Sequence, residues 1–259
     1  MTLFQAIVLA IVEGITEFLP ISSTGHLIIA QGILGIPSSD FVKAFMVNIQ
    51  FGAILSVIVL YWKRFFQSWR FYGLLAVACL PLFIAFLLEK VIDKMLGSVL
   101  VVAISMLAGG IFLLFTDRLF DRPGNEHTKL TYKKSFIIGL IQILAVIPGV
   151  SRSAATIIGG MSQKLSRKNA AEFSFFLAIP TLFAASALKL ARNYPLITGH
   201  NLKLLLVGNV VSFLVAMIAI QSFIAFLTKF GFRAFGVYRI LVGAAILILL
   251  AAGMNLAVL

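Results

Sequence analysis

Apolar runs long enough to cross a lipid bilayer constrain this chain more than any other feature. A membrane-spanning helix needs about 20 mostly apolar residues. Six stretches of the sequence meet that length, at about 42–62, 72–91, 98–116, 170–190, 204–228 and 236–256. Hydrophobic residues make up 61% of the 259 residues, and charged residues make up only 12%. These proportions exclude a water-soluble globule and a disordered chain, so we predict an all-α, polytopic membrane protein.

Two further apolar stretches are interrupted by polar turns. Residues 3–36 contain the turn 20–26, and residues 135–162 contain the turn 148–153. The apolar pieces on either side of each turn are too short for an easy crossing. Irregular backbone at membrane depth is tolerated only where protein buries it or a wet cavity faces it. We therefore expect two re-entrant helical hairpins in addition to the six spans.

The two hairpins begin the halves of an expected internal repeat. Shifting the sequence by 128 residues places Pro20 on Pro148 and Ser23 on Ser151 without a gap. Each half then holds one hairpin followed by three spans, so the second half is inverted relative to the first. Many transporters have this layout, with the ligand site where the broken helices meet.

The repeat makes a prediction about where the polar turns lie. The halves cover about residues 1–118 and 134–259, and together they form a single membrane domain over residues 1–259. The turn Ser22–His26 should meet the turn Ser151–Ser153 inside the membrane.

Lys and Arg residues gather on one side of the predicted spans. Fourteen lie on one side and six on the other, with Arg152 in the second broken stretch left out. Since positive loops stay in the cytoplasm, both termini are expected outside. Arg239 is counted among the fourteen as an anchor at the membrane interface. The net charge of +12 thus indicates orientation in a membrane, and we expect no nucleic-acid partner.

Glu13 and Glu17 lie four residues apart, so they share one helix face. A carboxylate inside a membrane span is costly and is by default a functional hypothesis. Two carboxylates on one face repel each other unless a cation lies between them or one is protonated. We expect them to hold a divalent cation, in the first place Mg²⁺ with Ca²⁺ as the alternative. A structural reading, in which both carboxylates cap a helix end in water, stays open.

The turn after Pro20 concentrates reactive groups. Ser22, Ser23, Thr24, Gly25 and His26 supply hydroxyls, a flexible backbone and an imidazole. We predict Ser23 as nucleophile with His26 as its general base, and Ser22, Thr24 and Gly25 as substrate-binding residues. His26 as the nucleophile and a metal-bound water stay open, as does a turn that only satisfies its own backbone.

The second turn supplies a cation. Arg152 is a guanidinium within an apolar stretch, and its planar fork suits phosphate oxygens. We predict that Arg152 is catalytic and that Ser151, Ser153 and Thr156 bind the substrate at a helix N-terminus. An ion pair between Arg152 and one of the two acids is the structural alternative. Gln50, eight residues into its span, is a further candidate for substrate binding.

These motifs resemble those of a known family. Residues 13–26 read EGITEFLPISSTGH and residues 148–153 read PGVSRS. Together they resemble the bacterial undecaprenyl-diphosphatase family, also called the bacitracin-resistance family, over nearly the whole chain. The resemblance implies hydrolysis of undecaprenyl diphosphate to undecaprenyl phosphate and inorganic phosphate. This reaction recycles the carrier lipid for peptidoglycan and other envelope polymers, and it confers resistance to bacitracin.

The resemblance also implies a setting and partners. The enzyme is expected in the bacterial plasma membrane, with membrane lipid and a polyprenyl diphosphate as partners. Although the pocket could open to either side, we expect it to open outward, where the carrier lipid is released when polymers are completed. A homodimer is an option. Phosphatases of the phosphatidic-acid type also use Ser-Gly-His and Ser-Arg loops. They require a His followed by Asp after the Ser-Arg, which residues 153–159 lack. The alternative function is a flippase of undecaprenyl phosphate that uses the same inverted-repeat pocket.

Overall fold

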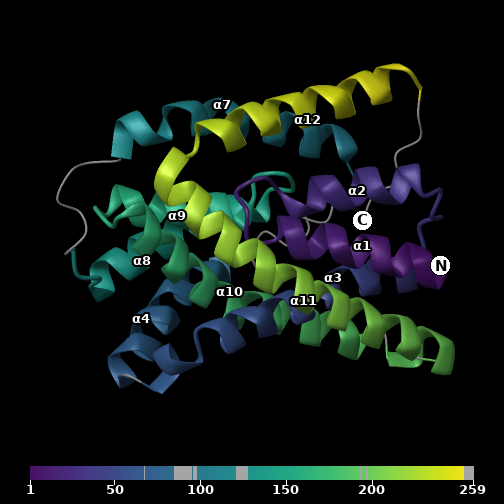
Figure 1. The fold of residues 1–259 in the computed structure, drawn as a ribbon, viewed down its shortest axis with the longest axis horizontal. Helices are drawn as coiled ribbons and strands as arrows, with labels where there is room; N and C mark the ends of the chain where they lie inside the picture. Colours follow the sequence, from purple (N-terminus) through teal and green to yellow (C-terminus); the bar gives the residue numbers. More distant parts are fainter. Residues whose placement is uncertain are drawn as a thin grey trace.

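The computed structural model describes residues 1–66, 68–84, 95, 98–120, 128–192, 194–196 and 198–253, and no strand occurs in these ranges. Five helices are long and apolar enough to cross a membrane (Figure 1). They are α3 (Asp40–Leu60), α7 (Val99–Phe120), α10 (Arg167–Arg192), α11 (Gly199–Phe230) and α12 (Arg233–Ala251). The protein is therefore an all-α, multi-pass membrane protein, as the apolar runs predicted.

The sixth predicted span, 72–91, is described only in its first part. That part forms α4 (Trp69–Cys79) and the 3-10 turn η2 (Leu80–Leu82). Residues 85–94 lie outside the described residues. The same holds for residues 121–127 in the polar loop between the two halves.

The two broken stretches form two helical hairpins. The first pairs α1 (Leu3–Thr16) with α2 (Ser23–Ile33), and the second pairs α8 (Tyr132–Gln142) and the 3-10 turn η4 (Ile143–Val146) with α9 (Arg152–Ser162). An 11-residue helix such as α2 is about 16 Å long, half of a bilayer core of about 30 Å. In Figure 1 the hairpins enter from opposite ends of the molecule, and their turns meet near its middle.

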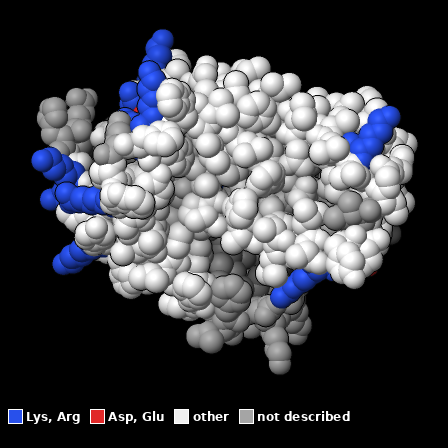
Figure 2. All heavy atoms as spheres, turned by 90° about the horizontal axis from the view of Figure 1, so that it is seen from below, with Lys and Arg blue, Asp and Glu red and all other residues white. Residues whose placement is uncertain are grey.

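Charged side chains mark the two ends of the molecule. In Figure 2 the Lys and Arg side chains stand toward the left end, toward the right end and at the lower right of the visible face, and its middle carries neither. A membrane protein requires this distribution, because the hydrocarbon layer excludes charge. The turns of both hairpins therefore lie at the depth of the apolar band.

Small residues let the helices around the hairpins approach closely. Gly110 on α7 faces Gly236 on α12, and a Cβ added at Gly110 would lie 2.9 Å from the carbonyl oxygen of Gly236. On the other side, the Asn209 side chain of α11 accepts from the Gly52 amide of α3 at 2.7 Å and donates to Asn48 at 2.9 Å. Small residues and interhelical amide bonds are the usual means of packing helices in lipid.

The correspondence between the hairpins differs from the prediction by one residue. Ser22 and Ser151, which cap α2 and α9, have positive φ values of 72° and 75°. Each hydroxyl accepts a hydrogen bond from the amide three residues later. Ser22, rather than Ser23, is thus the counterpart of Ser151, so Ser23 corresponds to Arg152. The shift of 128 residues without a gap was wrong here, because the two turns differ in length. Ser22 follows Pro20 by two residues, whereas Ser151 follows Pro148 by three.

Candidate active site

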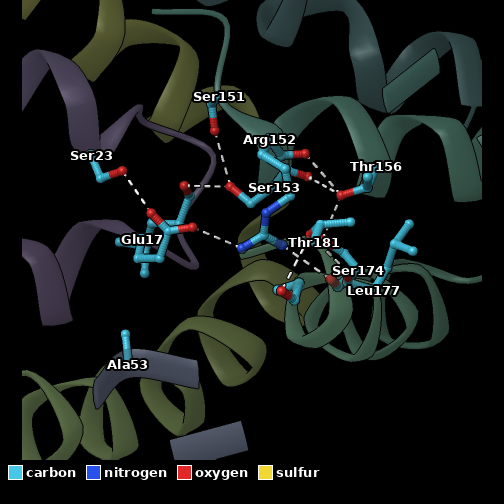
Figure 3. A network of polar contacts seen from close by, with 12 residues as sticks. Glu17, Ser23, Ala53, Ser151, Arg152, Ser153, Thr156, Ser174, Leu177 and Thr181 are labelled. Carbon is cyan, nitrogen blue, oxygen red and sulfur yellow. Dashed lines mark hydrogen bonds and ion pairs between the residues drawn. The ribbon is translucent and has the colours of Figure 1, made fainter. Parts of the chain in front are cut away.

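The two hairpin turns are joined by an ion pair. Oε1 of Glu17, at the C-cap of α1, lies 2.9 Å from Nη2 of Arg152, the first residue of α9. Both side chains are largely buried, with 5% and 12% of their surface exposed. Figure 3 shows the pair at the centre of a network that joins residues from both turns. The predicted meeting of the two turns is confirmed.

Both α2 and α9 begin at this point. Their capping residues, Ser22 and Ser151, line one pocket together with Ser23 and Arg152. A helix N-terminus presents free amides and a partial positive charge, which favours an anion. A side chain other than glycine adopts positive φ only at a cost. Here that strained conformation aims two helix N-termini at one pocket.

Ser23 and Glu17 are in direct contact. The Ser23 hydroxyl donates to Oε2 of Glu17 at 2.7 Å, so Glu17 contacts Ser23 with one oxygen and Arg152 with the other. A hydroxyl bonded to a carboxylate in a buried site has the arrangement of a nucleophile with its base. Sequence reasoning placed both residues in the site but did not pair them.

The hydrogen bonds of the His26 and Ser23 side chains go to other partners, so the predicted pairing of these two residues was wrong. Its Nδ1 donates to the Ser22 carbonyl at 2.7 Å, and its Nε2 lies 2.8 Å from the Tyr238 hydroxyl. In the neutral imidazole Nε2 accepts that bond. The two rings stack with an interplanar angle of 5°. Because both ring nitrogens are occupied, His26 braces α2 against α12 instead of facing the Ser23 hydroxyl.

Arg152 has contacts beyond its ion pair. Its Nη1 donates to the carbonyl oxygen of Ser174 at 3.0 Å and to the hydroxyl of Ser174 at 3.4 Å. Its guanidinium carbon lies 5.7 Å from the centre of the Phe18 ring. Its Nε is buried and has no acceptor within the part of the chain that the structure describes. The guanidinium is thus fixed in place by Ser174 and Glu17, with its Nε donor unused by the described residues.

Hydroxyl groups of the second hairpin hold the network together. Ser153 donates to the carbonyl oxygen of Leu19 at 2.6 Å, which ties the second turn to the first, and Ser151 lies 3.0 Å from Ser153. Thr156 donates to the Arg152 carbonyl at 2.9 Å and lies 2.6 Å from the Ser174 hydroxyl. Ser153 and Thr156 are fully buried and do not line the pocket, so they support the site rather than face a ligand.

The pocket itself has a volume of about 160 Å³. Among the predicted binding residues, Thr24 and Gln50 line it. Gly25 does not line the pocket. Packing explains why this position is a glycine, since a Cβ there would overlap the Met106 sulfur on α7. Thr24 and Gln50, together with Ser22 and Ser151, share the polar part of the wall with Glu17, Ser23 and Arg152.

Glu13 is a buried acid whose carboxylate has no hydrogen-bond donor among the described residues. It is fully buried on α1, and no described group donates a hydrogen bond to either of its carboxylate oxygens. A buried carboxylate needs a proton or a cation to offset its desolvation. The described residues contain no cluster of three or more His, Cys, Asp or Glu side chains that could hold a metal. Two carboxylates still fit Mg²⁺, which retains waters and binds through one or two carboxylates plus substrate phosphates.

Arg239 is the residue that sequence reasoning misplaced. It is fully buried on α12, whereas we expected an anchor at the membrane interface. Its guanidinium donates to five carbonyls, at distances between 2.8 and 3.3 Å. They belong to Pro20 in the first turn, Gly149 and Val150 in the second turn, and Ser105 and Met106 on α7.

The contacts of Arg239 hold both turns in register with α7 and α12. The sequence did contain a signal, because an Arg within an apolar span is by default functional. The span that was predicted to start at 236 placed Arg239 at its edge. The helix in fact begins at Arg233, so Arg239 lies almost two turns inside it.

Comparison with known proteins gives one family. The family model described as bacitracin resistance protein BacA matches residues 6–245. A protein of Porphyromonas gingivalis is 53% identical over the full length of both chains, and one of Bdellovibrio bacteriovorus is 54% identical over 99% of each. A protein of Aquifex aeolicus is 47% identical over 94% of this chain and 96% of its own. Each of the three is named undecaprenyl-diphosphatase.

Proposed function

The chain belongs to the family of bacitracin resistance protein BacA, and we infer from this membership and from its site that it hydrolyses undecaprenyl diphosphate. The products are undecaprenyl phosphate and inorganic phosphate. The observation that carries this function is the contact of Glu17 with both Ser23 and Arg152 at the meeting point of two helix N-termini. A base, a hydroxyl and a fixed guanidinium within one buried pocket suit phosphoryl transfer.

The first step is proposed as attack by Ser23. Its Oγ forms a bond to the terminal phosphorus while its proton moves to Glu17, which already accepts the hydroxyl at 2.7 Å. The bond from that phosphorus to the bridging oxygen breaks, and its electron pair leaves with undecaprenyl phosphate. Water then hydrolyses the phosphoserine, which restores the hydroxyl and releases inorganic phosphate.

Arg152 is proposed to stabilise the charge on the transferring phosphoryl group. Its Nε has no acceptor within the described residues, and Nη2 can exchange Glu17 for a phosphate oxygen. The amides at the starts of α2 and α9 add positive potential at the same place. In phosphoryl transfer such positioning and electrostatic stabilisation supply most of the catalysis.

A divalent cation, Mg²⁺ or alternatively Ca²⁺, is proposed at Glu13 and Glu17. Glu13 supports this assignment because it is buried without a described donor. When bound, the cation would neutralise charge on the diphosphate. Glu13, one helical turn before Glu17, would bind the cation with its carboxylate. Glu17 would share its negative charge between the cation and Arg152.

The direct test is phosphate release by the purified protein in detergent. Undecaprenyl diphosphate should release one inorganic phosphate per molecule, and Ser23→Ala should release none above background. Because detergent removes the two compartments that transport requires, release cannot arise from a flippase. A protein that binds the lipid without releasing phosphate would contradict hydrolysis and support the alternative of lipid transport.

The sidedness of the site is also a proposal. Both termini are proposed to lie on the outer side, which the positive-inside rule favours, and the site is proposed to open there. A homodimer is a separate proposal, which sizing of the detergent-solubilised protein against a monomer standard tests.

A further inference from the structure

One wall of the site pocket is apolar, and the residues that form it are only partly buried. We propose that the isoprenoid tail of the substrate leaves the pocket across this wall, formed by Ala145, Ile147 and Leu182 and here called the tail portal. The inference rests on the proposed function, since it takes the ligand to be a lipid diphosphate. It adds the place where the first isoprene units bind.

Helix α10 forms one side of the tail portal. Residues 170–178 are buried without exception, whereas Pro180 and residues 183–185 are exposed. Proline cannot donate the backbone hydrogen bond of a helix interior, and the Thr181 hydroxyl donates to the Leu177 carbonyl there at 2.9 Å. The helix therefore leaves the protein core at Pro180, and Leu182, two residues further on, reaches both the pocket and the surface.

The opposite side comes from the second hairpin. Ala145 lies in η4, the 3-10 turn of four residues that precedes the hairpin turn, and it is only partly buried. Its neighbour Leu144 is 55% exposed. The 3-10 turn η4 thus interrupts the regular α-helical wall beside the pocket, and the residues there are only partly buried or exposed.

The portal lies at the depth of hydrocarbon. Leu182 is about ten residues from the end of α10 at Arg192, which corresponds to about 15 Å along a helix, or half the bilayer core. Phe183 beside it is 51% exposed and packs against Phe51 with ring centroids 5.6 Å apart. A ligand that extends from Arg152 across this wall must be charged at one end and apolar at the other.

A second apolar recess offers a rival path. It lies between α1, α11 and α12, has a volume of about 590 Å³, and is lined by residues including Ile15, Ile218 and Ala219. It shares no lining residue with the site pocket. Because no described opening connects that recess to Arg152, it does not suit the tail of a lipid whose diphosphate lies at Arg152.

A matched pair of variants separates the two paths. Ala145→Phe fills the tail portal, and Ala219→Phe makes the same change in the rival recess. Ala145→Phe should raise the KM for undecaprenyl diphosphate about tenfold, which corresponds to about 1.4 kcal/mol, and leave the inhibition constant of inorganic pyrophosphate within twofold. Ala219→Phe should leave both unchanged. A raised KM in Ala219→Phe but not in Ala145→Phe, or equal KM values in both variants, overturns the proposal of the tail portal.

Photolabelling of the unaltered protein provides a second measurement that needs no variant to fold. The probe is a polyprenyl diphosphate with a diazirine in its second isoprene unit. Adducts at 144–147 or 182–183 support the portal. Adducts on α11 or α12, or none at either place, overturn it. Failure of the proposed function is distinguished by the unaltered enzyme, which would then release no phosphate at all.

Discussion

Glu17 and Arg152 are 135 residues apart in the sequence and form an ion pair of 2.9 Å in the middle of the molecule. One belongs to a hairpin that enters from one end and the other to a hairpin that enters from the opposite end (Figure 1). Neither hairpin alone holds both the acid and the guanidinium. The site therefore exists only where the two turns meet, and its chemistry depends on their register.

Ser23 as nucleophile predicts a phosphoenzyme. Substrate carrying a radiolabel in its terminal phosphate, quenched with acid during turnover, should leave label on the unaltered protein and none on Ser23→Ala. His26→Ala should retain label, since His26 contacts Tyr238 rather than Ser23. Label that persists in Ser23→Ala and disappears in His26→Ala would assign the nucleophile to His26.

Arg239 should be required for the arrangement of the site without touching substrate. Lysine has three donors and no planar fork, so Arg239→Lys leaves carbonyls of the two turns without a donor. A buried polar group left unsatisfied costs about 1–3 kcal/mol. We expect a fall in kcat of at least about tenfold and a lower melting temperature in detergent.

The matched control for Arg239 is Arg233→Lys, an exposed position on the same helix, which should be neutral. Because a positioning residue does not contact substrate, the KM in Arg239→Lys should change far less than kcat. A variant that melts earlier but keeps its kcat at a temperature where it is folded would reduce Arg239 to a purely structural role.

The cation proposed at Glu13 predicts dependence on a divalent metal. A chelator should stop phosphate release, and Mg²⁺ should restore it. Glu13→Gln removes one of two carboxylates, so the Mg²⁺ concentration for half-maximal activity should rise about tenfold or more. Glu172→Gln, which alters a carboxylate that pairs with Arg64 and does not line the site pocket, should leave that concentration unchanged. Full activity in chelator would contradict the metal assignment.

Thr24 lines the pocket and is partly exposed, so it reports on which side the pocket opens. Thr24→Cys in a Cys79→Ala background carries a single thiol, because Cys79 is the protein's only cysteine. A membrane-impermeant thiol reagent should label it in spheroplasts, and inorganic pyrophosphate should slow the labelling. Labelling confined to inverted vesicles would place the opening on the cytoplasmic side.

The sequence was sufficient to predict an all-α, multi-pass membrane protein and the meeting of the two turns. Charge is costly in lipid, so charged residues inside a membrane protein pair with one another. Glu17 and Arg152 each lie in a broken apolar stretch, and pairing offsets the cost of burying both charges. Length and hydropathy predicted the spans for a similar reason, since the bilayer fixes both. These predictions depend on the properties of the lipid bilayer and not on local backbone geometry.

Local backbone geometry could not be predicted in the same way. The positive φ of Ser22 turns Ser23 toward Glu17 and leaves His26 against Tyr238, 212 residues away, whereas spacing alone suggested that Ser23 and His26 touch. The five carbonyls that bind Arg239 come from three separate segments. Every residue has a backbone carbonyl, so the sequence does not show which carbonyls converge on Arg239.

The most direct measurement is a double-mutant cycle on Glu17→Gln and Arg152→Gln, with kcat for phosphate release as the readout. Each single variant should lose about 100-fold or more. If the two side chains act as one unit, the double variant should be about as slow as the slower single variant, because groups that act together are not additive. Losses that multiply in the double variant would show two independent contributions and contradict a single site built from both hairpins.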